Sequence, residues 1–89
     1  MFIIYSKPNC AYCVQAKNLL KSKGLEYLEL MLDLGQPKQP DTEYVFLRDL
    51  EKLLPGVSSV PQIFERLGGA VPATKHIGGL KELRTRLES

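Results

Sequence analysis

The strongest constraint on the fold lies in the first 34 residues, which read as a strand, a helix and a second strand. Residues 2–6 are apolar and rich in β-branched and aromatic side chains, as in a short buried strand, and Pro8 ends them. Residues 11–23 carry apolar side chains at helical spacing, and Gly24 follows as a helix stop. Residues 28–34 alternate leucine with other side chains, which is the period of a strand. Two strands joined by a helical crossover are expected to pair in parallel.

The rest of the chain predicts two more strands and two more helices. In chain order these are a helix to residue 54 capped by Asp41 or Thr42, strands at 62–65 and 74–77, and a helix opened by Gly78 and Gly79. The two strands follow each other closely enough to form a hairpin. The order β-α-β-α-β-β-α therefore predicts an α/β fold with a four-stranded mixed sheet flanked by helices.

Length and charge limit what such a chain does. With 89 residues we expect a single domain, 1–89, whose chemistry sits in a shallow surface groove. Twelve basic and ten acidic side chains give a net charge of +2 with dispersed basic residues, which favours neither nucleic acid nor a membrane as partner. The apolar start at residues 1–5 is too short for an export signal, and no stretch approaches the roughly 20 residues of a membrane span. We therefore expect a cytoplasmic protein.

The two cysteines are the strongest functional signal. Cys10 and Cys13 stand three residues apart at the expected start of the first helix, a spacing that chance gives in about 2% of such chains. Cys10 would face the unpaired N–H groups of the helix start, which favour its thiolate, and Lys7 adds a positive charge. Cys13, one turn deeper, is placed to resolve a mixed disulfide on Cys10. The motif indicates thiol–disulfide exchange.

The cysteine pair has two other interpretations. A zinc site would need more ligands than the chain offers, since there is no second C-x-x-C and His76 is the single histidine. No metal is therefore expected. The second interpretation is a pair of structural thiols, which would make their strand–turn–helix placement a coincidence.

Two further features are ambiguous when taken alone. Val60-Pro61 precedes a strand, and a cis bond there would leave the Val60 backbone free to pair with an extended peptide, although most X-Pro bonds are trans. Gly78-Gly79 before a helix suits an anion such as a carboxylate, or is a tight turn and nothing more. His76 is expected to be structural or solvated.

Three separated motifs together resemble the glutaredoxin family. They are residues 5–13 (YSKPNCAYC), 59–64 (SVPQIF) and 76–79 (HIGG), and the resemblance runs from Phe2 to about Leu87. It implies a thioredoxin fold and the reduction of protein disulfides and glutathione mixed disulfides, with electrons from glutathione. It also suggests ribonucleotide reductase as one protein substrate. A monomer is expected.

The resemblance implies roles for residues outside the cysteine pair. Val60 and a cis Pro61 would pair with the backbone of bound glutathione. Gly79, Leu80 and Lys81 would offer the helix N-terminus to the γ-glutamyl carboxylate.

Three more residues match positions near the glycine end of glutathione. These are Lys7, Tyr12 and Arg48, the last of which is almost as well explained as a solvated charge on the second helix.

The chain departs from the family pattern in places. Ala11 replaces the usual proline of the cysteine motif, Ser59 replaces threonine, and Lys81-Glu82 replaces small or acidic residues followed by Asp. The loop from Arg66 to Lys75 is longer than in compact members and would alter which protein substrates dock.

The expected mechanism begins with attack of the Cys10 thiolate on a substrate disulfide. A second glutathione, or Cys13, then resolves the mixed disulfide. The first alternative is a thioredoxin-like donor reduced by a flavin reductase. The second is an iron–sulfur carrier in which two chains share a cluster through Cys10 and glutathione, which the loss of proline at Ala11 makes more plausible.

Overall fold

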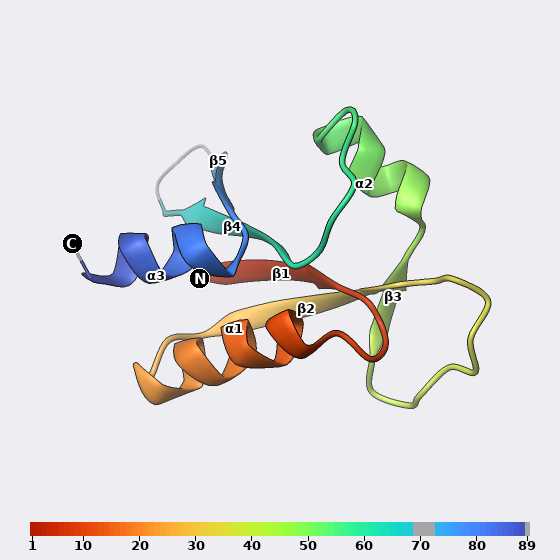
Figure 1. Cartoon of the computed structure of the whole chain (residues 1–89), viewed down its shortest axis with the longest axis horizontal. Coiled ribbons are helices and arrows are strands. Elements are labelled where there is room, and N and C mark those ends of the chain that lie inside the picture. Colours follow the sequence, from red (N-terminus) through yellow and green to blue (C-terminus); the bar gives the residue numbers. More distant parts are fainter. Residues whose placement is uncertain (69–72, 89) are drawn as a thin grey trace.

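The computed structural model describes residues 1–68 and 73–88, which form a five-stranded sheet with helices on both faces (Figure 1). The strand order is β3-β2-β1-β4-β5. The elements in chain order are β1 (Phe2–Ser6), α1 (Ala11–Ser22), β2 (Tyr27–Leu32), β3 (Glu43–Val45), α2 (Leu47–Leu53), β4 (Gln62–Leu67), β5 (Ala73–Gly78) and α3 (Leu80–Glu88).

The first three elements form as the sequence predicts. β1 and β2 pair in parallel, with Phe2 opposite Tyr27 and Ser6 opposite Met31. Helix α1 ends at Ser22, and Gly24 follows with a φ of 67°, a left-handed conformation that glycine adopts without steric cost. This β-α-β unit places β1 at the centre of the sheet.

The predicted sheet lacked one strand, β3. Residues 43–45 pair in parallel with residues 30–32 of β2, and Asp41 lies in a turn with a φ of 62°. Helix α2 therefore begins at Leu47, and the expectation of a helix capped by Asp41 or Thr42 was wrong. Phe46 is extended and takes the N-cap position, where its N–H donates to Asp49 Oδ2 at 3.4 Å. Pairing with β2 outweighs the local helix-start signal, because it satisfies the backbone N–H and C=O groups of residues 43–45. Local sequence patterns do not reveal this pairing.

The last two strands form the predicted hairpin. β4 pairs antiparallel with both β1 and β5, and the fold is the thioredoxin-like α/β fold expected from the sequence. Arg66 and Leu67 extend β4, and Ala73 to Lys75 belong to β5, so both ends of the predicted loop are strand. Residues 69–72 of that loop lie outside the described residues, and its effect on docking stays a prediction.

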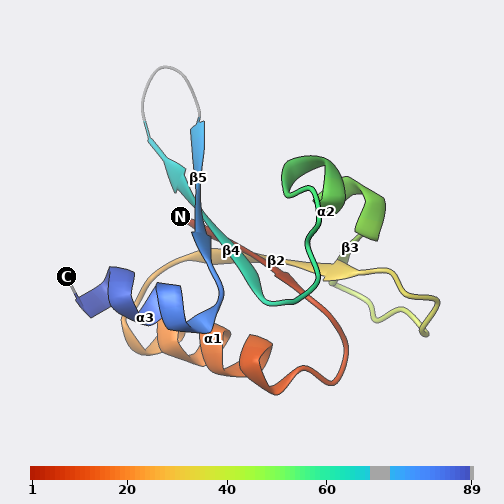
Figure 2. The ribbon, with the colours of Figure 1, turned by 45° about the horizontal axis from the view of Figure 1, so that its top comes forward.

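The sheet has a core on each face. Figure 2 shows α1 and α3 together on one face and α2 on the other. The larger cluster packs α1 and α3 on the sheet through Phe2, Ile4, Ala16, Leu20, Ile63, Leu80 and Leu83. The smaller cluster, under α2, contains Leu32, Leu50 and Phe64. In the described residues, none of the helices is long and apolar enough to span a membrane.

Candidate active site

Three segments that are distant in sequence meet at one end of the sheet. β1 ends there and leads into α1, and β4 starts there because it runs antiparallel to β1, with Tyr5 opposite Gln62. β5 also ends there, with Gly78 opposite Ile63, and leads directly into α3. Two helix N-termini and the start of β4 therefore converge at one place.

Cys10 is the N-cap residue of α1. Its backbone is extended, and its Sγ accepts the N–H of Cys13 at 3.2 Å. An N-cap side chain normally satisfies one of the donors that a helix start leaves unpaired, and here a sulfur does so. Asn9, just before it, has a φ of 56°, and this left-handed turn redirects the chain from β1 into the helix. Cys10 is only partly buried, so its sulfur is accessible from the surface.

Cys13 lies one turn deeper, with 2% of its surface exposed. It is joined to Cys10 by a disulfide, and the two Cα atoms are 5.3 Å apart. The pair thus combines one accessible sulfur with one shielded sulfur, which is the arrangement needed for a nucleophile and a resolving thiol.

The segment before β4 lies against Cys10. The Val60–Pro61 peptide bond is cis, as the resemblance implies, and the Val60 carbonyl oxygen is 3.8 Å from Cys10 Sγ. Gln62 holds this segment, because its amide donates to the Ser59 carbonyl at 2.9 Å and its Oε1 is 2.8 Å from His76 Nε2. His76 is exposed, and its ring lies tilted by 44° against that of Phe64 with centroids 5.0 Å apart.

A first groove, called here the α3 groove, runs from α1 across the cis-proline segment to the start of α3. Its volume is about 440 Å³. Its lining residues are Tyr12, Ser59, Val60, Pro61, Gly79, Leu80, Lys81, Glu82 and Arg84.

A second groove, the β2 groove, opens on the other side of α1 and contains both cysteines. Its volume is about 460 Å³. Its lining residues are Lys7, Pro8, Asn9, Cys10, Ala11, Cys13, Val14, Lys17, Glu29 and Met31. A smaller hollow of about 220 Å³ beside α2 shares Lys7, Ser59 and Val60 with these two grooves.

The structure brings most of the predicted site residues together. Six of them line the α3 groove, namely Tyr12, Val60, Pro61, Gly79, Leu80 and Lys81. Lys7 joins the two cysteines in the β2 groove. Arg48 lines neither groove: it is exposed on α2, with its guanidinium 4.7 Å from the centroid of the Phe46 ring. The binding roles of these residues stay predictions.

Sequence reasoning missed two features of the site. Glu82 caps α3, because its Oε1 accepts the Gly79 N–H at 2.8 Å, and the spacing of three residues is that of a capping box. Lys17 and Glu29 form an ion pair of 2.8 Å in the wall of the β2 groove. No sequence motif joins these two residues, since each alone resembles an ordinary surface charge. Within residues 1–68 and 73–88, no group of three or more His, Cys, Asp or Glu side chains is arranged to hold a metal ion.

Sequence comparison places this arrangement among known proteins. The glutaredoxin family model matches residues 2–67. The chain is 39% identical to glutaredoxin 3 of Escherichia coli K12 over 80 residues, which cover 90% of this chain and 77% of that protein. It is 38% identical to the hybrid peroxiredoxin hyPrx5 of Haemophilus influenzae over 80 residues, and 36% identical to chloroplastic glutaredoxin-C5 of Arabidopsis thaliana over 77. It spans only 26% and 37% of the lengths of these last two proteins.

Solved structures give the same result for the fold. The solution structure of a glutaredoxin from Brucella melitensis aligns with a TM-score of 0.61 at 33% identity, covering 98% of this chain and 77% of that one. Glutaredoxin 1 from Francisella tularensis, crystallised with cacodylate, also aligns with a TM-score of 0.61, at 25% identity, covering 98% of this chain and 91% of that one.

The family match covers the disulfide pair, the cis-proline segment and most of the sheet. The pair has the C-x-x-C spacing and the helix-start position of a redox-active dithiol. The chain belongs to the glutaredoxin family.

Proposed function

We propose that the protein is a glutathione-dependent thiol–disulfide oxidoreductase that reduces protein disulfides and glutathione mixed disulfides. The observation that carries this proposal is the position of Cys10, whose sulfur accepts the Cys13 N–H at the positive end of α1. A thiolate is stabilised by such a donor and by the helix dipole, and the thiolate is the form that attacks disulfides.

The α3 groove is the proposed glutathione site. Its lining residue Val60 has a carbonyl oxygen 3.8 Å from Cys10 Sγ, and a volume of about 440 Å³ is of the order needed by a tripeptide. An extended peptide there would pair with the Val60 backbone through main-chain hydrogen bonds. Its γ-glutamyl carboxylate would meet the N–H groups of α3 at Leu80 and Lys81. At Gly79 it would have to displace the Glu82 carboxylate, which accepts the Gly79 N–H at 2.8 Å. Lys81 adds a side-chain cation in the same groove.

The glycine end of glutathione is assigned to the opposite side of Cys10. Lys7 borders Cys10 in the β2 groove and would attract a carboxylate there, while Tyr12 lies 64% exposed on α1 and can cover the peptide. Arg48 would have to leave the Phe46 ring to contribute.

Both kinds of substrate react first with the same accessible sulfur, that of Cys10. The Cys10 thiolate attacks a mixed disulfide of glutathione, the S–S bond breaks, and the other thiol leaves with a proton from solvent. A second glutathione thiolate then attacks the adduct, releases Cys10 and forms glutathione disulfide. With a protein disulfide, Cys13 attacks the mixed disulfide on Cys10, which leaves the Cys10–Cys13 disulfide for two glutathiones to reduce.

The proposal extends to the setting in which the protein works. We expect a monomer in the cytoplasm that uses glutathione as its cosubstrate and disulfide-bonded proteins as partners, ribonucleotide reductase among them. No resident metal takes part in the proposed reaction.

The test is a coupled assay with glutathione, glutathione reductase and NADPH on the mixed disulfide of glutathione and mercaptoethanol. A parallel reaction replaces glutathione and its reductase with the flavoenzyme thioredoxin reductase. We expect turnover that saturates with the mixed disulfide and depends on glutathione. Turnover with thioredoxin reductase alone, and none with glutathione, would reject the proposal in favour of a thioredoxin-like donor.

A further inference from the structure

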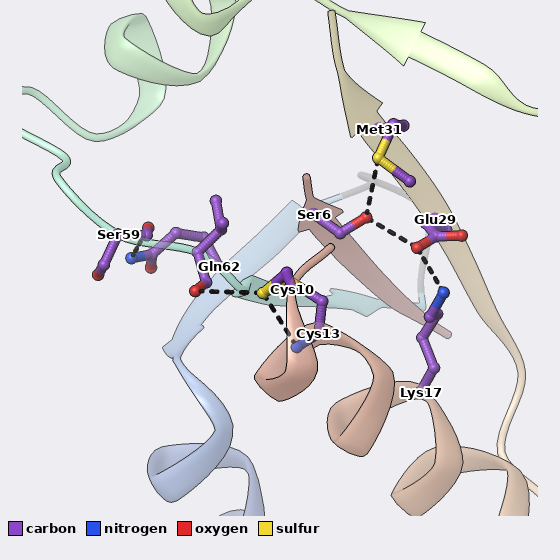
Figure 3. The surroundings of a disulfide bond; sticks show 9 residues. Ser6, Cys10, Cys13, Lys17, Glu29, Met31, Ser59 and Gln62 are labelled. Carbon is purple, nitrogen blue, oxygen red and sulfur yellow. Dashed lines mark hydrogen bonds and ion pairs between the residues drawn. A yellow bond between two sulfur atoms is a disulfide. The ribbon is translucent and has the colours of Figure 1, made fainter. Parts of the chain in front are cut away.

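A polar network forms the wall of the β2 groove behind the cysteines. The Ser6 hydroxyl donates to Glu29 Oε2 at 2.7 Å, and Lys17 Nζ lies 2.8 Å from the same oxygen. Ser6 is completely buried, although the Glu29 and Lys17 side chains are each 23% exposed. Figure 3 shows Lys17 reaching from α1 to Glu29 on β2, with Ser6 of β1 beside them. Side chains from β1 and α1 thus meet at the Glu29 carboxylate on β2.

This ion pair differs from the ordinary surface pairs of the protein. Lys38, paired with Asp33, is 50% exposed, and Arg86, paired with Glu65, is 43% exposed. In the Lys17–Glu29 pair neither partner is more than about a quarter exposed, and a buried hydroxyl fixes the carboxylate. Charges held in this way act on their neighbours with less screening by water than exposed pairs do.

The neighbour in question is Cys13. Lys17 stands four residues after Cys13 on α1, so the two side chains leave the same face of the helix. Lys17, Glu29 and Cys13 all line the β2 groove. The third charged group there is Lys7 from the loop after β1, and on the far side of α1 the start of α3 carries Lys81, Glu82 and Arg84. Lys17 and Glu29 are therefore two opposite charges, from α1 and β2, that share the β2 groove with the shielded Cys13.

We propose that Lys17 and Glu29, fixed by Ser6, act in opposite directions on the thiolate fraction of Cys13 and thereby on the rate of the dithiol route. This inference rests on the proposed function, because it concerns the resolving step of the same reaction. Lys17 favours the thiolate of Cys13 and Glu29 opposes it, so the pair holds the two effects in balance. Lys17 and Glu29 are positioning residues in this scheme, since neither touches the substrate.

The step affected is the attack of Cys13 on the mixed disulfide. The Cys13 thiol first gives its proton to water in the β2 groove. Its sulfur then bonds to Cys10 Sγ, the bond between Cys10 Sγ and the substrate sulfur breaks, and the substrate leaves as a thiolate that takes a proton from water. The substrate gains two electrons and the cysteine pair is oxidised. The monothiol route omits this step, so it should not respond to the pair.

The decisive experiment measures the ionisation of Cys13 alone. In a Cys10→Ser background, the ultraviolet absorbance of the remaining thiolate is followed against pH for Lys17→Met and Glu29→Gln. We expect Lys17→Met to lower the thiolate fraction at neutral pH about three- to tenfold, and Glu29→Gln to raise it by a similar factor, which is the range for one charge beside a half-buried group. The double variant should return close to the starting value.

Matched controls remove the same charges elsewhere. Lys21→Met lies one turn further along α1, and Glu26→Gln lies just before β2, and both residues are exposed. Neither should change the Cys13 titration by more than the error. If Lys17→Met and Glu29→Gln act in the same direction, or no more strongly than these controls, the proposal is wrong. Circular dichroism of each variant establishes that the fold is retained.

A kinetic readout separates this inference from the proposed function. With both cysteines present, Lys17→Met should slow reduction of a protein disulfide about three- to tenfold and leave reduction of the glutathione mixed disulfide within twofold. Equal losses in both reactions would contradict the inference. The titration needs no turnover, so it decides the role of the pair even if glutathione proves not to be the reductant.

Discussion

The two grooves beside α1 are built in different ways. The α3 groove joins residues from three distant parts of the chain, and its proposed binding groups are largely backbone N–H and C=O groups at Val60 and at the start of α3. The β2 groove comes almost entirely from the single unit β1-α1-β2, and side chains define it, namely the two cysteines and the pair Lys17–Glu29.

Backbone groups and side-chain charges suit different tasks, namely binding a peptide and controlling the ionisation of a cysteine. Backbone groups bind any extended peptide of suitable charge, which suits a cosubstrate recognised mainly by its main chain. Side-chain charges near a sulfur alter its ionisation, which suits control of the chemical step. We therefore assign the main chain and γ-glutamyl end of glutathione to the α3 groove, and control of the resolving step to the Lys17–Glu29 wall of the β2 groove, where only Lys7 would meet the glycine carboxylate.

The largest expected effect on turnover comes from replacing Cys10, whose sulfur reacts first with both kinds of substrate. Cys10→Ser should lower turnover of mixed disulfides and protein disulfides alike, by about a thousandfold or more, because no other accessible thiolate remains. The coupled glutathione assay with each substrate measures this loss. Substantial residual activity on either substrate would show that Cys10 is not the common nucleophile.

Replacing the deeper sulfur should separate the two routes. Cys13→Ser is expected to lower reduction of a protein disulfide at least about a hundredfold, because the mixed disulfide on Cys10 is no longer resolved internally. Reduction of the glutathione mixed disulfide should stay within about threefold of the parent. An equal loss on both substrates would contradict the separate assignment of the grooves.

A smaller effect is expected at the helix start in the α3 groove. Lys81→Gln should raise the KM for the glutathione mixed disulfide about threefold with little change in kcat, because one cation facing a carboxylate is lost. Lys23→Gln, at the exposed C-cap of α1, is the matched control and should leave both constants unchanged. The assignment of this groove to glutathione fails if the KM is equally insensitive to both substitutions.

In the β2 groove, Ser6→Ala tests the buried donor. Removing the hydroxyl leaves Glu29 without the 2.7 Å hydrogen bond, so the free energy of unfolding should fall by about 1–2 kcal/mol. Urea unfolding of the oxidised protein measures it. Ser22→Ala removes an exposed hydroxyl that donates to the Leu19 carbonyl and should change stability by less than about 0.5 kcal/mol. Equal effects at both serines would mean that the network adds no stability.

The smallest effect is expected outside both grooves, at Asp33. The Gly35 N–H donates to its Oδ1 at 3.1 Å and Lys38 lies at the same distance, and these contacts lower the pKa of the carboxyl from its ordinary value of 3.8. A lowered pKa in the folded state stabilises the protein above the unfolded pKa, and this contribution disappears as pH falls through the folded value. Asp33→Asn should therefore destabilise slightly at neutral pH and not at about pH 2. Urea unfolding at both pH values measures the difference, and an equal effect at both would contradict the assignment.

Local patterns predicted the β1-α1-β2 unit well, because helix and strand periods and the stop at Gly24 are properties of neighbouring residues. They failed at residues 41–45, where Asp41 and Thr42 are good helix caps but pairing with β2 makes residues 43–45 a strand. Only contact with a distant strand decides between the two, and the local sequence does not contain that information.

Some residues of the site could likewise be predicted from the sequence and others could not. The spacing of Cys10 and Cys13 predicts their role, whereas Val60 and Gly79 are ambiguous from the residues alone and take their predicted roles from the family resemblance. The Lys17–Glu29 pair was not found, because the two residues are twelve positions apart and meet only when α1 packs on the sheet. Glu82 could have been found from its spacing to Gly79, which matches a helix cap.

The most direct test of the account follows the glutathione adduct by NMR. Cys13→Ser protein, in which Cys10 is the one remaining cysteine, is treated with glutathione disulfide, adduct formation is followed by mass spectrometry, and backbone amide shifts are compared before and after. We predict one glutathione on Cys10, with the largest shifts at Val60, Gly79, Leu80 and Lys81 and small shifts at Glu29 and Met31. Failure to form the adduct, or shifts concentrated in the β2 groove, would contradict the account.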